Sequence, residues 1–104
     1  MPTATELAQG WVDAANNSDR AAFRALFAPD AVVIDTGRKF EGIDNIERWS
    51  DREFIGANMR IEIERIDTKS DGATLHSKVH SDGFNGRAKV EFTVQDGLIH
   101  RVHI

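Results

Sequence analysis

The segment LFAPDAVVID, residues 26–35, is the point at which the chain changes from helix to strand. An apolar helical stripe runs up to Phe27, and Pro29 ends the helix because proline disfavours helical geometry at the residue before it. Residues 31–35 follow as a short run rich in β-branched side chains, which Gly37 bounds. We therefore predict a helix before this segment and a strand within it.

Two helices are predicted upstream. Thr3 and Glu6 fit a capping box, in which the hydroxyl and the carboxylate each bond a free amide at the helix end. Ser18 or Asp19 is suited to cap the second helix. The apolar faces of the two helices recur at helical spacing. They consist of Leu7, Trp11, Ala14, Ala15, Phe23, Leu26 and Phe27.

A third helix is predicted after the strand. It opens at Gly42, and Gly56 is its expected C-terminal cap. The apolar side of this helix consists of Ile43, Ile46, Trp49 and Phe54.

From residue 59 onward the apolar residues recur with a period of two, which is typical of half-buried strands. Asp71-Gly72 and Asp96-Gly97 are predicted hairpin turns, while Asp82-Gly83 and Asn85-Gly86 compete for the remaining turn. The expected inner-facing residues are Met59, Ile61, Ile63, Leu75, Ser77, Val79, Ala88, Val90, Phe92, Val94, Leu98, His100, Val102 and Ile104. Helices followed by an antiparallel meander with one apolar face indicate the α+β class.

Length and composition restrict the class of protein. The chain has 104 residues, the size of one ordinary domain, so we predict a single domain over residues 1–104. A net charge of −4 disfavours nucleic-acid binding, which needs clustered positive charge. The absence of cysteine excludes disulfides and thiolate sites. There is neither an apolar run of membrane-spanning length nor a signal-peptide pattern, so no membrane association and a cytoplasmic location are expected.

Three polar residues fall on strand positions where apolar side chains are expected. Ser77 and His100 interrupt the inner row of the meander, and Asp35 ends the first strand on the same side as Val33. A polar residue on a buried face must find a partner or line a cavity. Ordinary alternatives stay open. Asp35 suits a turn, His100 suits a core histidine bonded to a carbonyl, and Ser77 suits a locally bonded small residue.

The spacing of the histidines does not suit a metal site. His76 and His80 share a strand face, but at ~3.3 Å per residue they lie roughly 13 Å apart. One ion with bonds of ~2 Å cannot bridge that distance. No phosphate-binding glycine loop or dinucleotide motif is present either, so neither a metal nor a cofactor is predicted.

Three stretches together resemble a known family. They are WVDAANNSD at residues 11–19, LFAPDAVVID at residues 26–35, and FEG at residues 40–42 with Ile46 and Trp49 beyond it. Over essentially its whole length the chain resembles the SnoaL-like and ketosteroid isomerase-like branch of the nuclear transport factor 2-like superfamily. The resemblance implies a curved antiparallel sheet wrapped around three helices, a cone with an internal cavity, and a homodimer.

The resemblance also implies roles for single residues. Asp35 falls where ketosteroid isomerases carry their catalytic aspartate base. Trp11 and Val90 fall where those enzymes carry the tyrosine and the protonated aspartate of their oxyanion hole, so only one of the two donors has a replacement here. His100 has no counterpart but is expected to face the same cavity, within reach of Asp35. The expected catalytic residues are Asp35 and His100, and the expected substrate-binding residues are Trp11, Trp49, Val33, Phe54, Val90 and Val102.

Three functions stay open. The first is an isomerase, cyclase or hydrolase type of enzyme in which Asp35, desolvated by the cavity, acts as general base on a small apolar carbonyl or polyketide-like substrate. In this enzyme His100 and the Trp11 indole stabilise the oxyanion. The second is a ligand-binding module without chemistry. The third is a dimeric interaction module whose pocket is only a defect in the core.

The outer face of the sheet is the predicted dimer interface. Side chains of both signs alternate there, which permits complementary pairing about a two-fold axis. They are Arg60, Glu62, Glu64, His76, Lys78, His80, Lys89, Glu91, Arg101 and His103.

Overall fold

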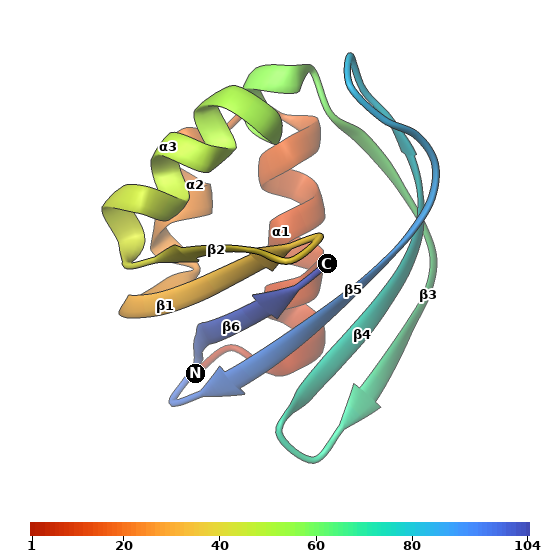
Figure 1. The fold of residues 1–104 in the computed structure, drawn as a ribbon. Helices are drawn as coiled ribbons and strands as arrows, with labels where there is room; N and C mark the ends of the chain where they lie inside the picture. The colour runs from red at the N-terminus through yellow and green to blue at the C-terminus, as the bar shows by residue number, and fades with distance from the viewer.

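The computed structural model describes residues 1–104 and confirms the predicted α+β class with three helices and a curved sheet (Figure 1). None of the helices is long and apolar enough to cross a membrane. The elements, in chain order, are α1 (Ala4–Asn16), α2 (Arg20–Ala25), β1 (Phe27–Asp35), β2 (Arg38–Glu41), α3 (Ile43–Glu53), the 3₁₀ turn η1 (Ile55–Ala57), β3 (Arg60–Lys69), β4 (Gly72–His80), β5 (Asn85–Gln95) and β6 (Leu98–His103).

The six strands form one open sheet in the order β2-β1-β6-β5-β4-β3. The sheet bends around the helices (Figure 1), with α1 packed against β3, β4 and β5 and α3 packed against β1 and β2. All neighbouring strands are antiparallel except β1 and β6, which run parallel. The predicted antiparallel arrangement holds for four of the five pairs. The pair of β1 and β6 is the exception, because most of the chain connects these two strands and no hairpin fixes their relative direction.

The change from helix to strand occurs earlier than predicted. Asp19 caps α2 through a bond from a helix amide to its carboxylate, and the helix ends at Ala25, so Phe27 belongs to β1. Pro29 lies inside the strand, where the register with β6 shifts between Phe27 and Val32. A proline is tolerated there because it removes no bond from a regular ladder.

The predicted hairpins form, one of them for a different reason. Asp96 and Gly97 both have positive φ, 54° and 73°, as a tight turn between β5 and β6 requires. Gly72 instead belongs to β4, and its φ is not positive. A side chain there would collide with the carbonyl of Phe92 on β5, so close backbone approach is what requires glycine.

Two further boundaries are settled. The turn between β4 and β5 contains Asp82-Gly83, whereas Asn85-Gly86 lies within β5. The predicted cap at Gly56 is wrong, since α3 ends at Glu53 and Gly56 lies inside η1.

A β-bulge in β6 changes the facing of His100. Thr93 pairs with Arg101 and Val94 pairs with Ile99, which leaves His100 as an extra residue without a partner. The extra residue shifts the alternation by one, so Ile99 as well as Val102 is fully buried. The prediction that His100 faces inward in the row of Val102 is therefore wrong.

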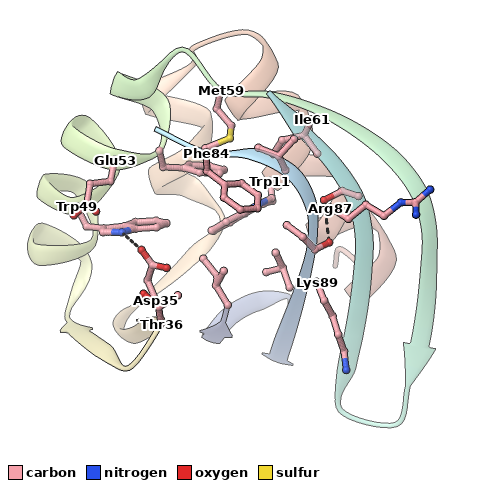
Figure 2. Close-up of a pocket in the computed structure, with 16 residues that line it drawn as sticks. Trp11, Asp35, Thr36, Trp49, Glu53, Met59, Ile61, Phe84, Arg87 and Lys89 are labelled. Carbon is pink, nitrogen blue, oxygen red and sulfur yellow. Dashed lines mark hydrogen bonds between the residues drawn. The ribbon is translucent and has the colours of Figure 1, made fainter. Parts of the chain in front are cut away.

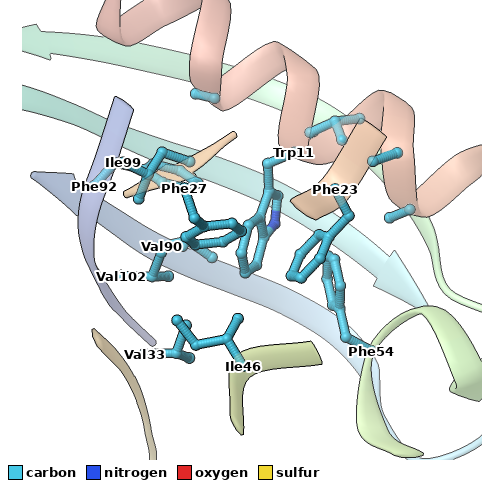
Figure 3. Packing of buried hydrophobic residues seen from close by; sticks show 14 of the residues in the cluster. Trp11, Phe23, Phe27, Val33, Ile46, Phe54, Val90, Phe92, Ile99 and Val102 are labelled. Carbon is cyan, nitrogen blue, oxygen red and sulfur yellow. The ribbon is translucent and has the colours of Figure 1, made fainter. Parts of the chain in front are cut away.

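The core is one cluster of 23 buried residues, and Trp11 lies at the centre of its aromatic part (Figure 3). The Trp11 ring lies between 4.4 and 6.3 Å from five other rings, measured between centroids. Those rings are Phe23, Phe27, Trp49, Phe54 and Phe92. One side chain of α1 thus joins α2, α3 and two strands of the sheet.

Truncation of Phe23 tests this cluster. Phe23 is 1% exposed and contacts Trp11, Phe27 and Phe54, so Phe23→Ala is expected to lower the free energy of unfolding by about 3–5 kcal/mol. Phe84 is half exposed, and Phe84→Ala should change stability by less than about 1 kcal/mol. Urea unfolding measures both variants. Equal losses would contradict the assignment of the core.

Candidate functional site

An apolar pocket of about 350 Å³ opens between α1, α3 and the inner face of the sheet (Figure 2). Ten of its 16 lining residues are hydrophobic, so the pocket suits a mainly apolar small molecule. The lining consists of Trp11, Asp35, Thr36, Trp49, Glu53, Phe54, Met59, Ile61, Ser77, Val79, Phe84, Arg87, Ala88, Lys89, Val90 and Ile104.

Five of the predicted site residues line this pocket and three do not. Trp11, Asp35, Trp49, Phe54 and Val90 are part of the lining. The three others are Val33, Val102 and His100. The two valines pair across β1 and β6 and have no exposed surface, so they form the closed core beneath the pocket. His100 lies outside the pocket because the bulge in β6 turns it away from the inner face of the sheet.

A tight turn positions Asp35. It is the last residue of β1 and pairs with Arg38, the first residue of β2. The two residues between them, Thr36 and Gly37, both have positive φ, 48° and 85°. This is the pattern of a type I′ hairpin turn, and a β-branched residue such as Thr36 is strained in it. The turn thereby sets the aspartate and the arginine side by side.

Two donors converge on one oxygen of Asp35. Trp49 Nε1 donates to Oδ2 at 3.1 Å (Figure 2), and Arg38 Nη2 donates to the same atom at 2.8 Å. The other oxygen, Oδ1, makes no hydrogen bond within the chain. These partners differ from the predicted ones, His100 and Trp11. Asp35 is therefore a fixed carboxylate with one occupied and one free oxygen.

Glu53 holds the same arginine. Arg38 Nη1 and Nη2 donate to its two carboxylate oxygens at 2.9 and 2.6 Å, a bidentate pair. The hydrogen bond from Arg38 lowers the pKa of Glu53, and Glu53 in turn raises the pKa of Arg38. The guanidinium also lies over the Phe40 ring, 5.5 Å from its centroid. Arg38 is thus held between two carboxylates and a ring.

Neither Arg38 nor Glu53 was among the predicted site residues. The signal for Arg38 was its place directly across the Thr36-Gly37 turn from Asp35, because residues that flank a two-residue hairpin turn face one another. Glu53 follows Trp49 by four residues, so both project from the same side of α3. No sequence signal joins Glu53 to an arginine that precedes it by 15 residues.

A second, more polar cavity of about 400 Å³ adjoins the first. The two share Asp35, Glu53, Met59 and Phe84, so the shared residues mark the boundary between them. Phe84 is at the end of a short loop that is internally braced, since Ser81 Oγ donates to the Phe84 carbonyl and accepts from its amide. An apolar chamber therefore adjoins a polar one at the two carboxylates. The second cavity is lined by Asp35, Arg52, Glu53, Gly56, Ala57, Met59, Ser81, Asp82, Gly83 and Phe84.

One donor in the apolar lining has no partner. Trp11 is 1% exposed and lines the pocket, yet its indole N–H makes no hydrogen bond within the chain. Ser77 is also buried in the lining, but its hydroxyl donates to the Ala88 carbonyl at 3.3 Å. The Trp11 N–H is not fully buried, because the buried side-chain polar atoms without a partner are Ser50 Oγ and Thr74 Oγ1. It can therefore donate to a ligand in the pocket. No group of three or more acidic or histidine side chains is arranged to hold a metal ion.

The chain matches the model of a known protein family. The description of the matching model is "SnoaL-like domain", and the match covers residues 8–102. The chain belongs to the SnoaL-like domain family. This confirms the resemblance stated from the sequence. A search of curated proteins found no match.

Solved structures share the SnoaL-like fold over almost the whole chain. A candidate polyketide cyclase from Sinorhizobium meliloti is 30% identical with a TM-score of 0.86, and the match covers 99% of this chain and 94% of that one. Delta 5-3-ketosteroid isomerase from Mycobacterium sp. is 20% identical with a TM-score of 0.81, over 96% and 89% of the chains. RV0760c from Mycobacterium tuberculosis, in complex with estradiol-17beta-hemisuccinate, is 21% identical with a TM-score of 0.81, over 96% and 90%.

The strain in the β1–β2 turn gives a prediction about stability. Asparagine tolerates positive φ better than a β-branched residue, so Thr36→Asn should raise the free energy of unfolding by about 0.5–1 kcal/mol. Thr93→Asn is the control, because Thr93 is an exposed strand residue without positive φ and should gain nothing. Urea unfolding compares them. A loss of stability in Thr36→Asn would contradict the strain.

Proposed function

We propose that this SnoaL-like protein is a proton-transfer enzyme that uses Asp35 as general base on a small, mainly apolar carbonyl compound. The observation that carries the proposal is the state of the Asp35 carboxylate. Oδ2 is occupied by Trp49 and Arg38, while Oδ1 is free in a residue that lines an apolar pocket. A fixed carboxylate with one unoccupied oxygen is suited to accept a proton from a bound molecule.

In the proposed step, Oδ1 of Asp35 takes a proton from the carbon next to the carbonyl group. The C–H bond breaks, an O–H bond forms on the aspartate, and the electron pair moves to the carbonyl oxygen as an enolate. The unpartnered N–H of Trp11 is the donor proposed for this oxygen, because preorganised donors stabilise charge that develops during reaction. Return of the proton from Asp35 to another carbon of a conjugated enolate gives an isomer. Attack of the enolate carbon on a second carbonyl gives a ring, and the alkoxide formed there takes the proton back from Asp35. His100 has no part in this step.

The family and the pocket support the substrate class. The solved structure with 30% identity is a candidate polyketide cyclase, a class of enzyme that works on carbonyl-rich molecules. A pocket of about 350 Å³ is at the lower end of the usual range for small-molecule sites, which favours a compact substrate.

A second candidate function is ligand binding without chemistry. It is favoured by the small number of donors, since Trp11 offers one unpaired N–H where the oxyanion hole of ketosteroid isomerases needs two donors.

A cytoplasmic location stays a prediction.

Replacement of Asp35 separates the two functions. A panel of cyclic and steroid ketones in D₂O reports base catalysis as deuterium uptake next to the carbonyl, measured by NMR. Asp35→Asn is expected to slow the exchange by about 10²–10⁴-fold, because an amide keeps the shape but accepts no proton. Quenching of tryptophan fluorescence by the same ketones should change little, since Trp11 and Trp49 remain in the pocket.

The matched control is Asp30→Asn. Asp30 is an exposed residue of the same strand and makes no hydrogen bond through its side chain, so its variant should exchange deuterium at the parental rate. Quenching without any Asp35-dependent exchange would favour the binding module. If the ketones cause neither quenching nor exchange, the interaction module is the function that remains.

We also propose that the protein forms a homodimer through the outer face of the sheet. Support comes from charged side chains of both signs that are exposed on β3, β4, β5 and β6. Lys89 lowers the pKa of Glu91 through a hydrogen bond, and the charge of Lys69 acts in the same direction, so two lysines lie near this acid. Such a face suits a second copy turned about a two-fold axis.

Light scattering at tens of micromolar tests the assembly. The expected mass is twice that of the 11.6 kDa chain. Lys78→Glu at an exposed position of β4 should weaken the dimer, whereas Asp13→Lys on the exposed side of α1 should not. A monomer mass for the parent protein would contradict the proposal.

A further inference from the structure

We infer that Arg38 is a positioning residue, which fixes the Asp35 carboxylate so that Oδ1 is the reactive oxygen, and that Glu53 holds Arg38 in place. The inference rests on the proposed role of Asp35 as a base. It assigns a division of labour that the fold family does not imply, since the resemblance gave no role to either residue.

The bonding pattern is asymmetric. Both donors to Asp35 bond Oδ2, and they come from two different elements, since Trp49 belongs to α3 and Arg38 to β2. Rotation about the last side-chain bond of an aspartate is soft and roughly two-fold, so a carboxylate with one donor exchanges its oxygens easily. Two donors on the same atom oppose that rotation. Oδ1 is therefore kept as the free oxygen.

Arg38 is itself held firmly. Its Nη2 lies 2.8 Å from Asp35 and 2.6 Å from Glu53, and its Nη1 bonds the second oxygen of Glu53 at 2.9 Å. Half of the arginine side chain is exposed, so the ion pairs alone are screened by solvent. The bidentate pair with Glu53 and the Phe40 ring beneath the guanidinium fix the orientation of the Arg38 side chain, which charge attraction alone would not fix.

Helix α3 supplies both Trp49 and Glu53. Trp49 and Glu53 are four residues apart on α3, so the first bonds Asp35 directly and the second holds the arginine that bonds Asp35. Trp49 is fixed in turn by its stacking on Phe54, with ring planes 10° apart. The aspartate is oriented by a rigid helix on one side and a hairpin partner on the other.

Arg38 lines neither cavity, although Asp35 and Glu53 line both. It contacts the carboxylates from outside the ligand space and acts on a substrate only through Asp35. The other charged groups at the cavities are Arg52, Asp82, Arg87 and Lys89. Of these, Arg87 and Lys89 pair with Glu64 and Glu91, and none bonds Asp35. Loss of Arg38 should therefore affect the chemical step more than substrate binding.

The test combines a spectroscopic signal with kinetics. The indole ¹H–¹⁵N NMR signal of Trp49, assigned with a Trp49→Phe variant, reports its bond to Asp35 without any substrate. Arg38→Met is expected to shift this signal, and Glu53→Gln should shift it less in the same direction. In the deuterium-exchange assay, Arg38→Met should lower kcat by about 10–100-fold with KM within twofold of the parent value. Arg38→Lys should recover only part of kcat, because one ammonium group cannot reproduce the planar guanidinium that bonds Glu53 through two nitrogens and Asp35 through one of them.

The matched control is Arg48→Met, an exposed arginine of α3 that bonds only Asn45 and should leave both readouts unchanged. If Arg38→Met does not fold, as judged by circular dichroism, Glu53→Gln alone decides through the indole signal. An unshifted Trp49 signal, or a rise in KM with kcat unchanged, would overturn the inference. If the parent protein shows no exchange with any ketone, the proposed function fails, while the indole signal still decides whether Arg38 positions Asp35.

Discussion

The packing of aromatic rings around Trp11 is the constraint on which the rest of the structure depends. This side chain contacts rings from α2, β1, α3 and β5, so one indole touches both the helices and the sheet. Large aromatic side chains bury the most apolar area per residue. A chain of 104 residues has a small core, and its central tryptophan contacts aromatic side chains from four other elements.

The same aromatic cluster supplies part of the apolar pocket wall and the two indole N–H groups at the site. Trp49 packs on Trp11 and Phe54, while its N–H reaches outward to Asp35. Trp11 shares the lining and keeps its own N–H unpaired. Because both indoles are held by packing, their N–H groups are fixed in direction before a ligand arrives. The cost of ordering donors is met by folding rather than by binding, which is the physical meaning of a preorganised site.

The parts of this protein that sequence predicts well are the local ones. Capping at Thr3, the period-two strands and the turn at Asp96-Gly97 depend on residues within a few positions of one another. The features that were missed depend on distant partners. The bulge at His100 exists because β5 and β6 pair in a particular register, and alternation alone cannot show an extra residue. The parallel pairing of β1 with β6 is non-local in the same way. Asp35 was found because it breaks a pattern, whereas its partners Arg38 and Glu53 break none.

The β1–β2 turn fixes the geometry of the Asp35–Arg38 pair at a cost in backbone strain. Thr36 holds a left-handed backbone that a β-branched residue disfavours, and strain of this kind persists only where the surroundings fix it. Here the surroundings are specific. The Thr36 amide donates to the carbonyl of Ile104, both residues line the pocket, and the turn closes on the Asp35–Arg38 pair. A longer, relaxed loop would spare the strain, but it would let the aspartate and the arginine separate. The tight turn therefore keeps the carboxylate, the cation that bonds it and two residues of the pocket lining within four consecutive residues.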